Sequence, residues 1–134
     1  MATNRTAVVT GASSGIGKAA ATALLRNGWN TVFCGRRQSL LEEAIAQAGV
    51  TEGEALAVAC DVTQADEVRM LFEAAVRTFG RVDLLFNNAG KGFKTTLIDE
   101  LPVDVWNDVV AVNLTGSFLC AREAFGVMRR QNPQ

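Results

Sequence analysis

The most specific pattern in this chain is the segment Thr10-Gly11-Ala12-Ser13-Ser14-Gly15-Ile16-Gly17. It follows an apolar run, Ala7-Val8-Val9, and opens a helical pattern, which is the sequence context of a dinucleotide-binding turn. Glycine lets the backbone approach a pyrophosphate without a Cβ in the way, and the following helix directs its positive N-terminus at the anion. The stretch therefore predicts an anion-binding turn between a strand and a helix.

The rest of the chain alternates strand patterns and helix patterns. Strands are predicted at 6–10, 31–34, 55–60 and 82–86, and helices at 15–27, 38–48 and 64–79. Pro102 suits the first turn of a further helix, whose periodicity runs, with or without a break, from Val105 to Met128. Helices between buried strands predict an α/β fold, a Rossmann-type doubly wound parallel sheet. The apolar residues that give the first helix its spacing are Ile16, Ala19, Ala20, Ala23 and Leu24.

Composition excludes several classes of protein. The chain has 134 residues, is 49% hydrophobic and has a net charge of −1, which predicts one soluble domain over residues 1–134. It lacks the basic excess of a nucleic-acid binder, and no apolar run approaches the ~20 residues of a membrane span. The absence of histidine excludes a histidine metal site and a Ser-His triad. Cys34, Cys60 and Cys120 lack metal-ligand spacing and predict buried thiols in a reducing cytoplasm, so no metal is expected.

The end of the second predicted strand distinguishes the two nicotinamide dinucleotides. An acid there would bind an adenosine ribose diol, but the segment is Cys34-Gly35-Arg36-Arg37, and no acid precedes Glu42. A carboxylate would repel a 2′-phosphate, whereas arginine binds it through paired, charge-assisted hydrogen bonds. Two solvated arginines before a helix are the simpler interpretation of the pair alone. Together with the glycine turn, the pair predicts NADP(H) rather than NAD(H).

Polar segments also end the third and fourth predicted strands. An aspartate in Asp61-Val62 can accept a hydrogen bond from the exocyclic amine of adenine, or cap the helix that starts near Gln64. The segment Asn87-Asn88-Ala89-Gly90 either faces a cofactor crevice or forms a polar turn. Because ligands bind outside the carboxyl ends of parallel strands, we expect both segments near the glycine turn.

Taken in order, these segments resemble the short-chain dehydrogenase/reductase family. The match comprises TGASSGIG at 10–17, Asp61-Val62, NNAG at 87–90 and Asn113 within 106–113, in family order across essentially the whole chain. The resemblance implies that Asn113 is the catalytic-tetrad asparagine that orients a proton-relay water, although an amide buried at a helix kink would look the same. It implies that the cofactor-binding residues are Gly11, Ser13, Ser14, Gly15, Ile16, Gly17, Arg36, Arg37, Asp61, Val62, Asn88, Ala89 and Gly90.

The resemblance further implies the strand order 3-2-1-4 and the reaction. The family transfers hydride between nicotinamide and a carbonyl or secondary alcohol of a small-molecule substrate, and its members commonly form homo-oligomers. A tyrosine, a lysine four residues later and an upstream serine move the proton in the family, but this chain contains no tyrosine.

We therefore expect a truncated sequence, the N-terminal half of a larger single-domain protein whose later strands are absent, and no activity from these residues alone. The strand at 82–86 would then be an apolar sheet edge. The alternative is a non-catalytic fragment that binds NADP(H) or another subunit.

Overall fold

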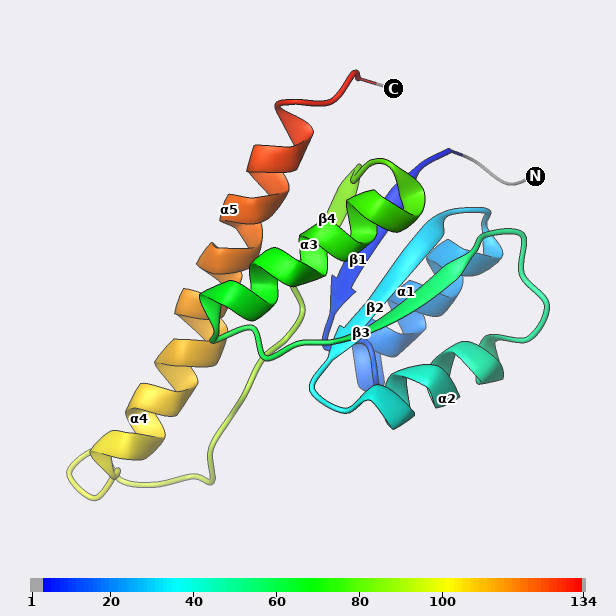
Figure 1. Cartoon of the computed structure of the whole chain (residues 1–134). Coiled ribbons are helices and arrows are strands. Elements are labelled where there is room, and N and C mark those ends of the chain that lie inside the picture. Colours follow the sequence, from blue (N-terminus) through cyan, green and yellow to red (C-terminus); the bar gives the residue numbers. More distant parts are fainter. Residues whose placement is uncertain (1–3, 134) are drawn as a thin grey trace.

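Strands and helices alternate along the chain in the computed structural model, which describes residues 4–133 (Figure 1). Their bounds are β1 (Thr6–Thr10), α1 (Gly15–Arg26), β2 (Asn30–Gly35), α2 (Gln38–Ala48), β3 (Ala55–Ala59), α3 (Ala65–Phe79), β4 (Leu84–Phe86), α4 (Val103–Val110), the π-helical segment η1 (Ala111–Gly116) and α5 (Ser117–Met128).

The four strands form one parallel sheet in the order β3-β2-β1-β4, which confirms the predicted fold class. Val8 of β1 lies in register with Val32 of β2 and with Leu85 of β4. The chain winds outward from β1 to β3 and then returns to the other side of β1. Such a reversal between β1 and β4 opens a crevice at the carboxyl ends of the strands.

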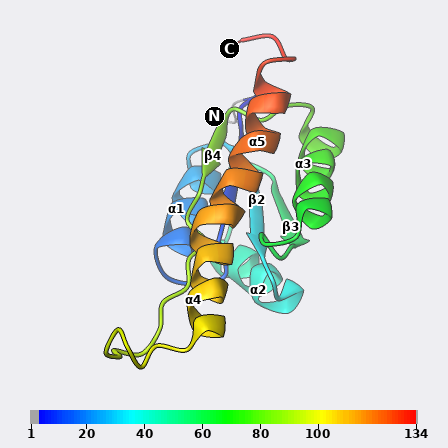
Figure 2. The ribbon, with the colours of Figure 1, turned by 90° about the vertical axis from the view of Figure 1, so that its left-hand side faces the viewer.

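Helices cover both faces of the sheet. In Figures 1 and 2, α1 and α2 lie on one face and α3 and α5 on the other. Alternate residues of each strand divide between the two cores, because successive side chains of a strand point to opposite faces. Val9 and Phe33 pack with the α1–α2 side, whereas Val8 and Val32 pack with the α3–α5 side.

The buried face of α1 differs from the predicted spacing. Gly17, Ala21 and Leu25 are buried, whereas the side chain of Ile16 is 74% exposed. These three residues repeat every four positions, which is also a helical face. A Cβ on Gly17 would lie 2.2 Å from the carbonyl oxygen of Gly11, so Gly17 must face the turn. This close approach fixes the rotation of the helix, and apolar spacing alone does not reveal it.

The last helices form one continuous rod, drawn from yellow to red in Figure 1. Pro102 is the N-cap residue rather than part of the first turn, because its ψ of 139° is extended, and the helix begins at Val103. The rod widens into a π-helical turn at Ala111–Gly116 instead of breaking. Within residues 4–133, no helix has the length and apolar character needed to cross a bilayer.

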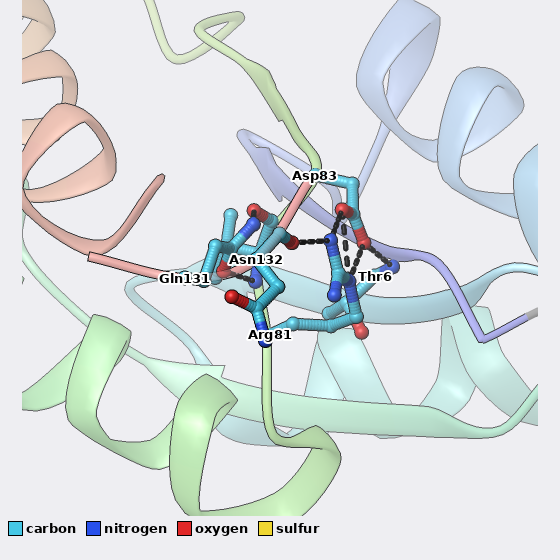
Figure 3. A network of polar contacts seen from close by, with 6 residues as sticks. Thr6, Arg81, Asp83, Gln131 and Asn132 are labelled. Atoms are coloured by element: carbon cyan, nitrogen blue, oxygen red, sulfur yellow. Dashed lines mark hydrogen bonds and ion pairs between the residues drawn. The ribbon is translucent and has the colours of Figure 1, made fainter. Parts of the chain in front are cut away.

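Strand β4 begins two residues later than predicted, because the backbone of Val82 bonds to the Gln131 side chain and not to β1 (Figure 3). The Val82 N–H donates to Oε1 of Gln131 at 3.1 Å, and Nε2 of Gln131 donates to the Val82 carbonyl at 2.6 Å. The Asp83 N–H donates to the Thr6 carbonyl at 2.8 Å. The residues of β4 are half-buried, since β4 is an edge strand with β1 as its one partner in the sheet.

Asp83 and Arg81 form the centre of this network. Arg81 Nε donates to Asp83 Oδ2 at 2.8 Å, and the Thr6 N–H donates to the same oxygen at 2.9 Å. The two charged side chains are only 12% and 11% exposed. Burial raises the pKa of the Asp83 carboxyl, but the bonds from Arg81 and Thr6 and the charges of Arg81 and Arg5 outweigh it, so the pKa is lowered.

Substituting Asp83 by asparagine tests the network. A carboxylate whose pKa is lower in the folded protein than in the unfolded chain raises the free energy of unfolding. This stabilisation is fully present above the pKa of the unfolded chain, about 3.9, and is lost as the pH falls through the pKa of the folded protein. We expect Asp83→Asn to lower the free energy of unfolding at pH 7 by about 2 kcal/mol and to weaken its decline in acid. Urea denaturation at several pH values measures both.

The matched control is Asp66→Asn, because Asp66 pairs with Arg69 in the open with 85% of its side chain exposed. This control should change stability by less than about 0.5 kcal/mol. Equal stabilities of the Asp83→Asn variant and the wild type at pH 7 would contradict the network's role.

Candidate functional site

A cleft of about 610 Å³ lies along the edge where the four strands end. The cleft is lined by the turns that follow the strands and by residues of α4 and η1. The turn residues that line it are Gly11, Ser13, Ser14, Cys34, Gly35, Arg36, Arg37, Cys60, Asp61, Val62, Thr63, Asn88, Ala89, Gly90 and Lys91, and the rod contributes Asp108, Ala111 and Val112. The structure thus brings together ten of the predicted site residues; Gly15, Ile16, Gly17 and Asn113 do not line the cleft.

The glycine turn has the backbone of an anion cradle. Gly11 and Gly15 have φ values of +64° and +57°, a region in which a side chain is strained. Space is open around the Cβ position of Gly15. Ser14 is the N-cap of α1 but makes no side-chain cap bond. The first N–H groups of a helix have no partner within the helix, and the Ser14 side chain does not supply one to α1.

Thr10 joins the turn after β1 to the turn after β4. Its buried hydroxyl accepts the N–H groups of Asn88 at 3.0 Å and Ala89 at 2.9 Å, and it donates to the Phe86 carbonyl at 3.4 Å. The Asn88 amide donates to the Thr10 carbonyl at 3.2 Å. The sequence does not indicate this role, because a threonine at the end of an apolar strand fits the β-branched pattern without any partner.

Arg36 and Arg37 follow β2 and line the cleft. Both side chains are exposed. Within residues 4–133, neither guanidinium has a hydrogen bond or ion pair, whereas Arg26 and Arg81 both bond to protein groups. The pair therefore supplies two guanidiniums to the cleft wall whose N–H donors are free to bind a ligand.

Asp61 does not cap α3, and the capping alternative is wrong. Its Oδ1 accepts the N–H of Thr63 at 3.0 Å and the Thr63 hydroxyl at 2.8 Å, which forms a tight turn before the helix. The N-cap is Gln64, which makes no side-chain cap bond. The chain turns once more between Asp61 and the helix, so the carboxylate cannot reach the first helical N–H groups and stays in the cleft wall.

Asn113 lies in the π-helical segment and is exposed, so it is not an amide buried at a kink. Its Oδ1 accepts the Lys91 N–H at 2.7 Å, and its Nδ2 donates to the Lys91 carbonyl at 2.9 Å. The side chain thus fixes the backbone of the loop after β4. Single π-helical turns within α-helices occur frequently at functional sites.

Two of the buried cysteines, Cys34 and Cys120, are unsuited to nucleophilic chemistry. A hydrogen bond with Cys60, together with burial, raises the pKa of the Cys34 thiol, and burial raises that of Cys120 to about 12. These two thiols are therefore protonated at neutral pH. Among residues 4–133, no group of three or more His, Cys, Asp or Glu side chains is placed to hold a metal ion.

Comparison with known proteins identifies relatives over the whole described chain. The family model for short chain dehydrogenases matches residues 5–133. A 3-oxoacyl-(acyl-carrier-protein) reductase of Synechocystis sp. is 40% identical over 130 residues, which are 96% of this chain and 52% of that protein. An uncharacterized oxidoreductase of Staphylococcus aureus is 36% identical over 97% of this chain and 55% of its own length. The chain thus spans about half the length of these curated relatives.

Solved structures share the fold closely. Levodione reductase superposes with a TM-score of 0.92 at 31% identity, over 98% of this chain and 52% of that one. A metagenomic short-chain oxidoreductase in complex with NADP gives a TM-score of 0.88 at 32% identity, covering 95% and 57%. NAD⁺-bound xylitol dehydrogenase gives 0.89 at 32% identity, covering 93% and 48%.

Adding one methyl group to Gly17 tests the architecture of the turn. A Cβ there would lie 2.2 Å from the Gly11 oxygen and 2.4 Å from Asn88 Nδ2, so Gly17→Ala should force the turns apart. We expect a loss of about 1–3 kcal/mol in the free energy of unfolding. Gly92→Ala is the control, since no atom lies within 4 Å of its Cβ position. Equal denaturation midpoints for the two variants would contradict the close approach.

Proposed function

This chain belongs to the short-chain dehydrogenase/reductase family, and we propose that it supplies the cofactor site of an NADP(H)-dependent oxidoreductase. The reaction would transfer hydride between nicotinamide and a carbonyl or secondary alcohol of a small molecule. The observation that carries the choice of cofactor is the pair Arg36 and Arg37, two guanidiniums that line the cleft and have no partner among residues 4–133.

The cleft fits a dinucleotide that lies across the carboxyl edge of the sheet. The sheet order places the end of β1, with its glycine turn, between the ends of β2 and β4. In the proposed pose, Arg36 and Arg37 hold the 2′-phosphate, and the turn Gly11–Gly17 receives the pyrophosphate through Ser13, Ser14, Gly15 and Ile16. Asp61 and Val62 flank the adenine, while Asn88, Ala89 and Gly90 flank the nicotinamide side.

Charge supports NADP(H) over NAD(H). Solved relatives hold either NADP or NAD⁺, so membership of the family is compatible with both. A charged hydrogen bond to a phosphate contributes on the order of 1.5–3 kcal/mol, equivalent to roughly ten- to a hundredfold in affinity. No acid occurs before Glu42, so no carboxylate of the first three elements would oppose the 2′-phosphate.

The chain's own residues bind and orient rather than transfer the proton. A bound nicotinamide would supply or accept the hydride. Asn113 holds the loop at the nicotinamide end through its two bonds to Lys91, and its relay role stays a prediction from the family resemblance. Because the chain has no tyrosine, we propose that these residues alone bind NADP(H) without turnover. That composition also favours the second candidate, an NADP(H)-binding module without chemistry.

Assembly and location also stay predictions. We expect a homo-oligomer in the cytoplasm. Leu114, Phe118 and Phe125 on the η1–α5 rod are largely exposed, which is compatible with a contact to a second subunit.

Removing one guanidinium tests the cofactor assignment. We expect Arg36→Met to weaken NADPH binding by about ten- to a hundredfold, because one charged fork on the 2′-phosphate is lost, and to leave NADH binding nearly unchanged. Isothermal titration of both dinucleotides measures this.

Arg77→Met is the control, because Arg77 is an exposed arginine on α3 that does not line the cleft. A wild-type protein that binds NADH more tightly than NADPH, with Arg36→Met altering neither, would refute the NADP(H) assignment. Turnover of NADPH by the 134 residues alone would refute the proposal that they only bind.

A further inference from the structure

Lys91 and Asp108 form an ion pair at the β4 end of the cleft. The Lys91 ammonium lies 3.4 Å from Asp108 Oδ2, and both residues line the cleft. Lys91 follows NNAG in the loop after β4, whereas Asp108 belongs to α4. The pair therefore connects the loop after β4 to α4.

The backbone of Lys91 is fixed, whereas its ammonium is exchangeable. Asn113 holds the Lys91 N–H and carbonyl at 2.7 and 2.9 Å, so the start of the side chain has a defined place. The side chains of Lys91 and Asp108 are 46% and 63% exposed. Ion pairs in such open positions hold weakly, and a ligand phosphate can replace the carboxylate at little cost.

Cations therefore flank the glycine turn on both sides. Arg36 and Arg37 stand at the end of β2 and Lys91 beyond the end of β4, with the end of β1 between them. Two strand spacings separate β2 from β4, which is about 10 Å. A dinucleotide held by Arg36 at its 2′-phosphate and by the turn at its pyrophosphate would extend its nicotinamide half toward Lys91.

We propose that Lys91 is a further cofactor-binding residue, whose ammonium leaves Asp108 and binds the pyrophosphate and ribose oxygens of the nicotinamide half. This inference rests on the proposed function. An ammonium has three donors and no acceptor, which suits phosphate and hydroxyl oxygens. Asp108 then competes with the cofactor for the ammonium and holds the lysine until the cofactor displaces it.

Two ligands allow the contributions of the two sides of the cleft to binding to be measured separately. NADPH would contact both sides, whereas 2′,5′-ADP carries the 2′- and 5′-phosphates of the adenosine and lacks the nicotinamide half. By isothermal titration, we expect Lys91→Met to weaken NADPH binding about tenfold and to leave 2′,5′-ADP unchanged. Asp108→Asn should strengthen NADPH binding about two- to threefold, because it frees the ammonium. Lys94→Met is the matched control, since Lys94 lies on the same loop and does not line the cleft.

The outcomes distinguish the two proposals. Unchanged NADPH affinity in Lys91→Met, or an equal loss for both ligands, would overturn the role of Lys91 while the proposed function stands. A wild-type protein that binds neither ligand would overturn both. Unfolding curves of Lys91→Met that match the wild type show that a loss of affinity arises at the site and not from the fold.

Discussion

The structure depends on one close contact, in which the turn after β1 is packed against both α1 and the turn after β4. A side chain at Gly17 would collide with the Gly11 carbonyl and the Asn88 amide, so the contact requires the missing Cβ. The Thr10 hydroxyl completes it by accepting two N–H groups from the β4 turn. Because the helix can approach only in this rotation, Ala21 and Leu25 face the core.

The two ends of the sheet treat polar groups in opposite ways. At the amino ends of β1 and β4, Arg81 and Asp83 are nearly buried and satisfy each other and the backbone of Thr6 (Figure 3). At the carboxyl ends, Arg36 and Arg37 are exposed and have no partner within residues 4–133. A buried network whose polar groups are all hydrogen-bonded contributes to stability, whereas cations without a protein partner at a cleft can form their hydrogen bonds with a ligand. The same strands thus have a closed structural end and an open end that lines the cleft.

Local patterns predicted most of the fold, and long-range contacts account for the errors. Strand and helix order followed from alternation and spacing, and the glycine turn, Arg36 and the NNAG segment lie along one edge because parallel strands end there. The predicted start of β4 was wrong by two residues, because the side chain of Gln131, 49 positions away, hydrogen-bonds to the backbone of Val82. Thr10 and the Lys91–Asp108 pair were missed for the same reason, since each depends on a partner that no nearby residue indicates.

The division of the cleft explains what these residues can specify. In the proposed pose, the β2 side of the cleft meets the part of a dinucleotide that differs between NADP(H) and NAD(H), so the two arginines there would select the cofactor. The β4 end would meet the part that both cofactors share, and there Asn113 holds the backbone of Lys91. Selection and positioning would then rest on different strands, separated by the glycine turn. A substitution at Arg36 would change the preferred cofactor while Asn113 still holds the loop at the nicotinamide end, because the two residues lie on opposite sides of that turn.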